Sequence, residues 1–219
     1  MSEVNLIALS KPSAITDCNT AGDLIAYTAR VSNPANQSNT QTAPKLLRYL
    51  IKENHWSPLE MTSACLEIET TRDIARQILR HRSFSFQEFS QRYADPTQDL
   101  KFVTREARLQ DLKNRQNSVV SDDELLHAQW EQYQNKVIDA AKTAYSWAVT
   151  RGIAKEQARA VLPEGLTMSR MYMNGTLRSW IHYIELRSAN GTQQEHMDVA
   201  KACAKVIADI FPLSESFVE

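Results

Sequence analysis

A run of partly alternating residues, 63–69, passes directly into a helical pattern, with neither glycine nor proline between the two. Ala64, Leu66 and Ile68 fall on one side of the run, which is the spacing of a half-buried strand. Residues 70–73 resemble a capping box, with threonine at the N-cap and aspartate three positions later, and predict that a helix begins there. A strand followed at once by a helix indicates an α/β domain.

Apolar spacing and turn residues divide the rest of the chain into further strands and helices. Residues 4–9 are apolar enough for a strand covered on both faces, and residues 166–173 are expected to be extended. Helical spacing predicts helices at residues 20–31, 45–53, 72–79, 121–151, 153–161, 176–187 and 194–211. Residues 95–122 are polar and charged, which indicates a strand fragment within a surface excursion. The expected fold is α/β (α+β), one compact domain of residues 1–219 with a central mixed or antiparallel sheet flanked by long helices.

The helix predicted at residues 121–151 is the longest, and a second capping box at residues 121–124 marks its start. Apolar residues recur along it at steps of three and four: Leu126, Trp130, Tyr133, Val137, Ala140, Ala144 and Ala148. We expect this stripe to pack against the rest of the chain, so its aromatic side chains should belong to the core rather than contact a cofactor.

Residues 80–92 hold a dense cluster of side chains suited to chemistry, with three arginines, one histidine, three serines, one glutamate and three phenylalanines. Three arginines against one glutamate give a formal charge of +2, whereas the whole protein carries −1. A planar guanidinium forms forked hydrogen bonds to phosphate. The cluster therefore predicts an anion-binding site with a polar, aromatic-lined wall. The alternative interpretation is a solvated basic end of a helix.

Further candidates lie on the helices around this cluster. Gln77 and Arg80 are three residues apart on one helix, so both can face the same ligand. Arg159 and Arg187 lie at later helix ends and are expected to converge on the same anion. His81 lies between two arginines, and repulsion between like charges is expected to lower its pKa.

The remaining histidines and the cysteines predict no catalytic centre of their own. Taken singly, His55 and His182 are expected to be structural, while His127 and His196 fall on polar helix positions and receive no role. The three cysteines are isolated and lack a CxxC pair, which predicts free thiols and no metal site. No serine or cysteine lies in a GxSxG elbow. The chemistry is therefore expected to come from a bound cofactor.

Composition and charge argue against several classes of function. A net charge of −1 is unlike that of a general nucleic-acid binder. The five glycines are far apart, so neither a GxGxxG motif nor a P-loop is present, and side chains must bind any phosphate. No apolar run approaches the roughly 18 residues of a membrane-spanning helix, and no signal peptide is apparent. We expect a cytoplasmic protein with neither nucleic-acid nor membrane partners.

The order of residues in the central cluster resembles a known family signature. Arg80-His81-Arg82, two residues, Ser85, four residues, Ser90, one residue and Arg92 is similar to the RHRxxS and SxR signature of the flavin-dependent thymidylate synthases. Blocks that resemble the same family are residues 29–32, 55–60, 158–163 and 177–187. In the second block serine replaces threonine, and methionine follows it where the family has histidine. The similarity runs from about residue 29 to residue 195.

The resemblance implies an enzyme that methylates 2′-deoxyuridine 5′-monophosphate (dUMP) to the thymidine nucleotide. Methylenetetrahydrofolate gives the carbon, and tightly bound FAD, reduced by NADPH, gives the hydride. Members of the family use neither a cysteine nucleophile nor a metal. The resemblance also implies a homotetramer whose active sites are shared between subunits.

Position by position, the resemblance assigns residues to each ligand. The residues expected to contact FAD are Ser32, His55, Ser57, Arg80, His81, Arg82, Glu88, Thr176, Arg178 and His182. The residues expected to bind dUMP are Gln77, Arg80, Glu88, Phe89, Ser90, Gln91, Arg92, Arg159 and Arg187. Arg187 is expected to lie against the uracil edge and favour ionisation at N3, which makes it the catalytic residue. Two positions depart from the family pattern: Thr176 stands where asparagine is usual, and residues 191–193 read Gly-Thr-Gln in place of His-Ala-Gln.

Two other classes of function are compatible with the central cluster. A nucleotide-binding regulator on the same scaffold would recognise the anion without chemistry and would need no redox cofactor. An RNA-binding protein would use residues 80–92 as a basic aromatic patch, with stacking by Phe84, Phe86 or Phe89. The net charge of −1 and the spread of the other arginines argue against RNA.

Overall fold

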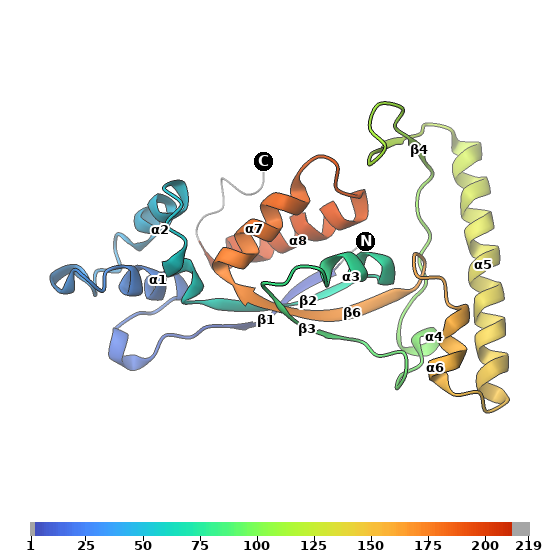
Figure 1. Cartoon of the computed structure of the whole chain (residues 1–219), viewed down its shortest axis with the longest axis horizontal. Helices are drawn as coiled ribbons and strands as arrows, with labels where there is room; N and C mark the ends of the chain where they lie inside the picture. The colour runs from blue at the N-terminus through green and yellow to red at the C-terminus, as the bar shows by residue number, and fades with distance from the viewer. Residues whose placement is uncertain (1–2, 212–219) are drawn as a thin grey trace.

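Four antiparallel strands form the centre of the computed structural model, which describes residues 3–211 (Figure 1). Residues 1–2 and 212–219 of the expected domain lie outside the described residues. The strands are β1 (Glu3–Leu9), β2 (Ser63–Thr71), β3 (Ser85–Glu88) and β6 (Met168–Thr176), in the order β1-β2-β6-β3. Every neighbouring pair is antiparallel. The prediction of a mixed fold with a central antiparallel sheet is therefore confirmed.

Helices α3 (Arg72–Ile78), α7 (Leu177–Ser188) and α8 (Gln194–Ile210) lie over one face of this sheet (Figure 1). α3 continues β2 without a loop, and α7 continues β6 in the same way. Because side chains alternate between the two faces of a strand, Ile68 of β2 and its cross-strand partner Met171 both point into one layer and are fully buried. The main core lies between the sheet and these three helices.

The remaining elements extend the molecule at both ends of the sheet (Figure 1). α1 (Ala21–Ala29) and α2 (Ala43–Lys52) lie at one end, and α4 (Pro96–Asp99), α5 (Glu124–Thr150) and α6 (Lys155–Ala158) lie at the other. The short elements are the 3₁₀ helices η1 (Ala14–Thr16), η2 (Pro34–Asn36), η3 (Ser57–Glu60) and η4 (Arg159–Val161), and the hairpin of β4 (Arg108–Gln110) with β5 (Ser118–Val120). The surface excursion expected at residues 95–122 thus contains α4 and this hairpin. None of the helices in residues 3–211 has the length and hydropathy needed to cross a bilayer.

The first strand differs from its prediction, since we expected residues 4–9 to be covered on both faces. β1 lies at the edge of the sheet beside β2 alone, and its register shifts between Leu6 and Ala8. Leu6, Ile7 and Leu9 remain 44, 51 and 36% exposed. Hydropathy indicated a buried strand because it does not reveal which strand lies at the edge of a sheet.

Two helices begin later than their predicted capping boxes. α3 has Thr71 rather than Thr70 at its N-cap, because β2 continues to pair with β6 through Thr71. The Thr71 hydroxyl donates to Asp73 Oδ1 at 2.6 Å, and no side chain caps this helix. α5 begins after Asp123, whose carboxylate accepts from the backbone N–H three residues later, while Ser121 lies outside the helix. Strand pairing and a local turn therefore override the local capping signals.

The buried side of α5 shares only Ala148 with the apolar stripe that we predicted. Its buried residues are Gln134, Ile138, Ala141, Tyr145 and Ala148. Trp130, Tyr133 and Val137 of the predicted stripe are 45, 61 and 49% exposed. The helix turns Gln134 inward, because its amide bonds to the backbone N–H and C=O of Arg105 at 2.8 and 2.9 Å. Most of the aromatic stripe of α5 is therefore exposed on the surface of the single chain.

Gly175 in β6 leaves room for the buried ring of Phe84, and this packing is testable. A Cβ atom at Gly175 would lie 2.4 Å from Phe84 Cδ1, whereas one at Gly22 of α1 would meet no atom closer than 3.7 Å. We expect Gly175→Ala to lower the free energy of unfolding by about 1–3 kcal/mol, as overpacking of a core does. Gly22→Ala is the matched control and should leave that free energy unchanged or raise it slightly. Denaturant unfolding at equal protein concentration measures both, and equal midpoints would contradict the packing argument.

Candidate functional site

The residues between α3 and β3 hold the Arg-His-Arg sequence in a tight turn. The backbone N–H of His81 donates to the last residue of α3 at 3.0 Å. Phe84 is buried, and its ring lies 4.8 Å from the ring of Trp180, so it anchors the turn on the core. Arg80 and Arg82 are exposed on either side of the half-buried histidine. The turn thus presents two cations to solvent.

Arg187, near the end of α7, contacts His81 directly. Its Nε donates to His81 Nε2 at 2.9 Å. Burial, followed by the charges of Arg187 and Arg80, lowers the pKa of His81 to about 4, so the imidazole is neutral near pH 7 and accepts this hydrogen bond. The predicted direction is confirmed, although burial contributes most. Among residues 3–211, Arg187 forms no ion pair with a carboxylate.

A second histidine, which is buried and to which the sequence assigned no role, lies beside this pair. His196 of α8 is fully buried, and its ring centroid is 6.3 Å from that of His81. Burial, followed by Arg187 and His81, lowers the pKa of His196 to about 3. The polar position expected for it is wrong, because His196, Val199 and Cys203 share the buried face of α8. Its spacing of three and seven residues from these apolar neighbours is the signal that would have found it.

His196 connects Gln77 of α3 to α7. Its Nδ1 lies 3.2 Å from Gln77 Oε1, and its Nε2 lies 3.2 Å from the hydroxyl of Tyr183. Gln77 Nε2 in turn donates to Gln193 Oε1 at 2.8 Å. The ring of Tyr183 also lies 4.9 Å from that of His81, which bonds to Arg187. The structure therefore brings three predicted site residues together around the buried end of α3.

Glu88 belongs to a different group. Its Oε1 accepts from Arg76 Nη2 at 2.6 Å and from Ser169 Oγ at 2.8 Å. Arg72 Nη1 lies 3.7 Å from the same oxygen. Within the described residues Glu88 is thus paired with the arginines of α3 and forms neither a hydrogen bond nor an ion pair with Arg80.

Arg92 and Arg159 meet at Glu156 of α6. Arg92 Nη2 lies 3.2 Å from Glu156 Oε2, and Arg159 Nε donates to the backbone carbonyl of Glu156 at 3.3 Å. Gln91 is only 3% exposed, and its Nε2 has no hydrogen-bond partner in the part of the chain described here. The two predicted substrate residues that precede Gln91 are half-buried. Arg92 and Arg159 thus form a second group at Glu156.

Other residues predicted to bind FAD lie along the first half of α7 and on the segments before β2. Arg178 forms an ion pair with Glu60 of η3, and the ring of His182 lies 4.5 Å from that of Trp56. Three more of these residues are exposed: Ser32, His55 and Ser57. Thr176 caps α7, since its Oγ1 accepts from the backbone N–H of Ser179 at 3.3 Å. Within one chain, the predicted site residues therefore fall into separate groups.

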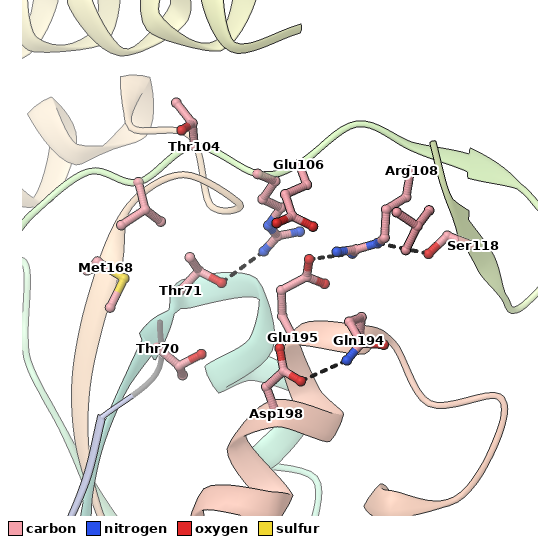
Figure 2. Close-up of a pocket in the computed structure, with 13 residues that line it drawn as sticks. Thr70, Thr71, Thr104, Glu106, Arg108, Ser118, Met168, Gln194, Glu195 and Asp198 are labelled. Carbon is pink, nitrogen blue, oxygen red and sulfur yellow. Dashed lines mark hydrogen bonds and ion pairs between the residues drawn. The ribbon is translucent and has the colours of Figure 1, made fainter. Parts of the chain in front are cut away.

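A cavity of about 490 Å³ lies between the end of β2, the β4–β5 hairpin and the first turn of α8 (Figure 2). None of the predicted site residues lines it. Arg108 forms an ion pair with Glu195 and donates from Nε to Ser118 Oγ at 2.9 Å. Burial would raise the pKa of Glu195, but hydrogen bonds from Arg108 and Gln193 hold it below its usual value. Sequence reasoning missed this cavity because Arg108 lies in a stretch that resembles a surface loop.

Two of the three cysteines are poor thiolate nucleophiles in this arrangement. Cys18, Cys65 and Cys203 are free. Burial raises the pKa of the Cys65 and Cys203 thiols, so both are protonated near pH 7. Within residues 3–211, no group of three or more histidine, cysteine, aspartate or glutamate side chains is placed to hold a metal ion.

Comparison with known proteins gives a consistent result. Residues 14–213 match the family model described as thymidylate synthase complementing protein. A probable flavin-dependent thymidylate synthase of Paramecium bursaria Chlorella virus 1 is 50% identical over 207 residues, which cover 94% of each chain. A flavin-dependent thymidylate synthase of Synechocystis sp. is 47% identical over 219 residues, which cover 99% of each chain. Among solved structures, this chain is similar to the UMP/dUMP methylase PolB from Streptomyces cacaoi in a crystal structure with 5-Br dUMP. The two are 25% identical with a TM-score of 0.80, and the match covers 98% of this chain and 93% of that chain.

The two neutral histidines predict that the fold loses stability in acid. Unfolding returns each imidazole to water, where its pKa is about 6.5, so the unfolded chain binds protons that the folded chain excludes. The free energy of unfolding should therefore fall as the pH is lowered from about 6.5 toward 4. His196→Asn removes one titrating group and should flatten this dependence. Denaturant midpoints measured across this pH range check the prediction, and equal slopes for the variant and wild type would contradict it.

Proposed function

This chain belongs to the flavin-dependent thymidylate synthase family, and we propose that it converts dUMP to the thymidine nucleotide by reductive methylation. In this proposal methylenetetrahydrofolate is the carbon donor and NADPH the reductant. FAD, when bound, supplies the hydride. The observation that carries the proposal is Arg187, a half-buried guanidinium that contacts a neutral histidine and, within residues 3–211, no carboxylate.

A cation without a carboxylate partner is suited to stabilise negative charge on a bound ring. The hydrogen bond from Arg187 Nε to His81 orients the guanidinium and leaves its Nη groups for a ligand. Arginine remains charged at every physiological pH, and neutral His81 does not offset that charge as a carboxylate would. We therefore assign to Arg187 the activation of the uracil ring, on which negative charge develops when N3 ionises.

The residues of the turn after α3 and of α7 fit a phosphate-bearing cofactor. Arg80 and Arg82 are exposed, and in the described part of the chain neither forms an ion pair with a carboxylate. Their guanidinium groups are free to bind a diphosphate. The neighbouring rings of Trp56 and His182 offer an aromatic surface. The residues that we propose to hold FAD are Ser32, His55, Ser57, Arg80, His81, Arg82, Glu88, Thr176, Arg178 and His182.

A second set of residues is proposed to bind dUMP. Arg92 and Arg159 both contact Glu156, so a nucleotide phosphate would compete with that residue for two guanidinium groups. The buried amide of Gln91 lacks a protein partner, and an unsatisfied buried donor of this kind suits a ligand oxygen. The proposed set is Gln77, Arg80, Glu88, Phe89, Ser90, Gln91, Arg92, Arg159 and Arg187.

We also propose that residues 1–219 form one domain of a cytoplasmic homotetramer whose active sites are shared between subunits. The division of the predicted site into separate groups supports sharing. The exposed aromatic stripe of α5, with Trp130 and Tyr133, and the exposed apolar side chains of β1 support association, because such surfaces commonly mark protein contacts. A nucleotide-binding regulator or an RNA-binding protein is not favoured, since relatives at 47 and 50% identity are named as synthases.

A visible absorbance spectrum of the purified protein, recorded before and after addition of NADPH, tests the proposed function. We expect flavin bands that bleach with NADPH, because the reductant transfers hydride to the cofactor. Addition of dUMP and methylenetetrahydrofolate should then yield the thymidine nucleotide, detected by chromatography. UMP in place of dUMP is the substrate control, and equal turnover of UMP would change the substrate assignment. A colourless protein that takes up no added FAD would contradict the proposal and favour the regulator.

Arg187→Ala tests the role of the guanidinium. Methylation should fall by about 100-fold or more, as it does when a donor to a developing charge is removed, while FAD stays bound. Arg151→Ala, at an exposed position after α5, is the matched control and should leave turnover unchanged. Turnover and flavin content of both variants are measured together. Wild-type turnover by Arg187→Ala would remove the catalytic role, and loss of flavin would show that the residue acts in cofactor binding.

A further inference from the structure

A continuous chain of hydrogen bonds leads from the β4–β5 hairpin toward the buried side of α7. It begins at the ion pair of Arg108 with Glu195 in the first turn of α8 (Figure 2). Gln193 Nε2 donates to Glu195 Oε2 at 2.9 Å, and Gln193 Oε1 accepts from Gln77 Nε2 at 2.8 Å. His196 Nδ1 then contacts Gln77 Oε1 at 3.2 Å. This series of hydrogen bonds thus passes through Gln77, which we propose to contact the substrate.

The carboxylate of Glu195 determines the direction of every hydrogen bond in this chain. An ionised carboxylate only accepts, so Gln193 turns its NH₂ group to Glu195 and its carbonyl to Gln77. Gln77 must then donate from Nε2, which leaves its carbonyl facing His196. His196 therefore carries its proton on Nδ1, and its Nε2 accepts from the hydroxyl of Tyr183. Each side chain has one orientation that satisfies both of its neighbours.

The inner half of this chain is enclosed by aromatic side chains. His196 and Tyr183 are 0 and 1% exposed, and Tyr183 packs with ring centroids 6.0 Å from both Phe84 and Trp180. Apolar residues of similar volume would fill this space without desolvating polar groups. A fully satisfied polar network in a core contributes a unique arrangement of side chains more than it contributes stability. Gln77 is half-buried and lies at the edge of the core. The network determines the orientation of its side chain.

We infer that His196 and Gln193 are positioning residues that hold the amide of Gln77 in one orientation toward the substrate nucleotide. This inference rests on the proposed function, because it takes Gln77 as a substrate contact. Gln77 uses one N–H on Gln193 and its carbonyl on His196, which leaves one N–H of Nε2 for a ligand. That N–H recognises an acceptor oxygen of the nucleotide. A rotated amide would present a carbonyl to the same oxygen and repel it.

Binding of dUMP to the FAD-loaded protein tests the inference in a double-mutant cycle. Gln77→Ala and His196→Leu should each weaken dUMP binding about five- to tenfold, the effect of one or two lost hydrogen bonds. Because His196 acts through Gln77, adding His196→Leu to Gln77→Ala should cause no further loss. His196→Asn, whose amide can still donate to Gln77, should bind dUMP within about twofold of wild type. Additive losses, or unchanged binding by His196→Leu at equal flavin content, would overturn the inference.

Nitrogen-15 NMR of the imidazole rings gives a reading that does not depend on the substrate. The chain has only five histidines, so histidine-selective labelling separates their signals. His196 should show the Nδ1–H tautomer, and Glu195→Gln, which frees Gln193 to rotate, should produce a mixture of both tautomers. An Nε2–H tautomer in the wild-type protein would overturn the inference. A wild-type protein that binds no dUMP would contradict the proposed function instead. The tautomer of His196 would still confirm or contradict the direction of the hydrogen bonds.

Discussion

The pairing of β2 with β6 is the constraint on which the rest of the structure depends. The two strands pair antiparallel from Ser63 opposite Thr176 to the far end of each strand, and each passes straight into a helix. Because the strands are antiparallel, α3 and α7 begin at opposite ends of the pair and run back over the same face. The ends of these helices then meet, and the contact between His81 and Arg187 follows from that geometry.

Two arginines near this meeting point have opposite surroundings. Arg108 lies against the carboxylate of Glu195, so its charge is balanced within the chain. Arg187 lies against neutral His81 and close to neutral His196, and burial keeps both rings uncharged. A carboxylate beside Arg187 would cancel the charge that an anionic ring needs. Hydrogen bonds through Gln77 connect Arg108, whose charge is balanced, to the surroundings of Arg187, whose charge is not.

The single chain leaves two kinds of groups without the partners that their chemistry favours. Exposed cations after α3 and the buried amide of Gln91 suit phosphate and ligand oxygens. The exposed aromatic stripe of α5, including Trp130 and Tyr133, suits an apolar partner surface. Both observations support the proposed assembly, in which neighbouring subunits would complete one another's sites. The strand that hydropathy alone would have buried, β1, also exposes apolar side chains at the edge of the sheet.

The sequence by itself determined strand β2, helices α3, α7 and α8, and the order of charged groups in residues 80–92. Hydrophobic periodicity and a short signature depend on residues within a few positions of one another, so both can be recognised in the sequence alone. Only the tertiary structure decided which side of α5 is buried and that His196 lies beside His81. Those outcomes depend on contacts between distant residues, such as His81 with Arg187 at a separation of 106 positions and Gln77 with His196 at 119. A hydrophobic period shows that a face will be covered, but the segment that covers it is selected by the packing of the whole chain.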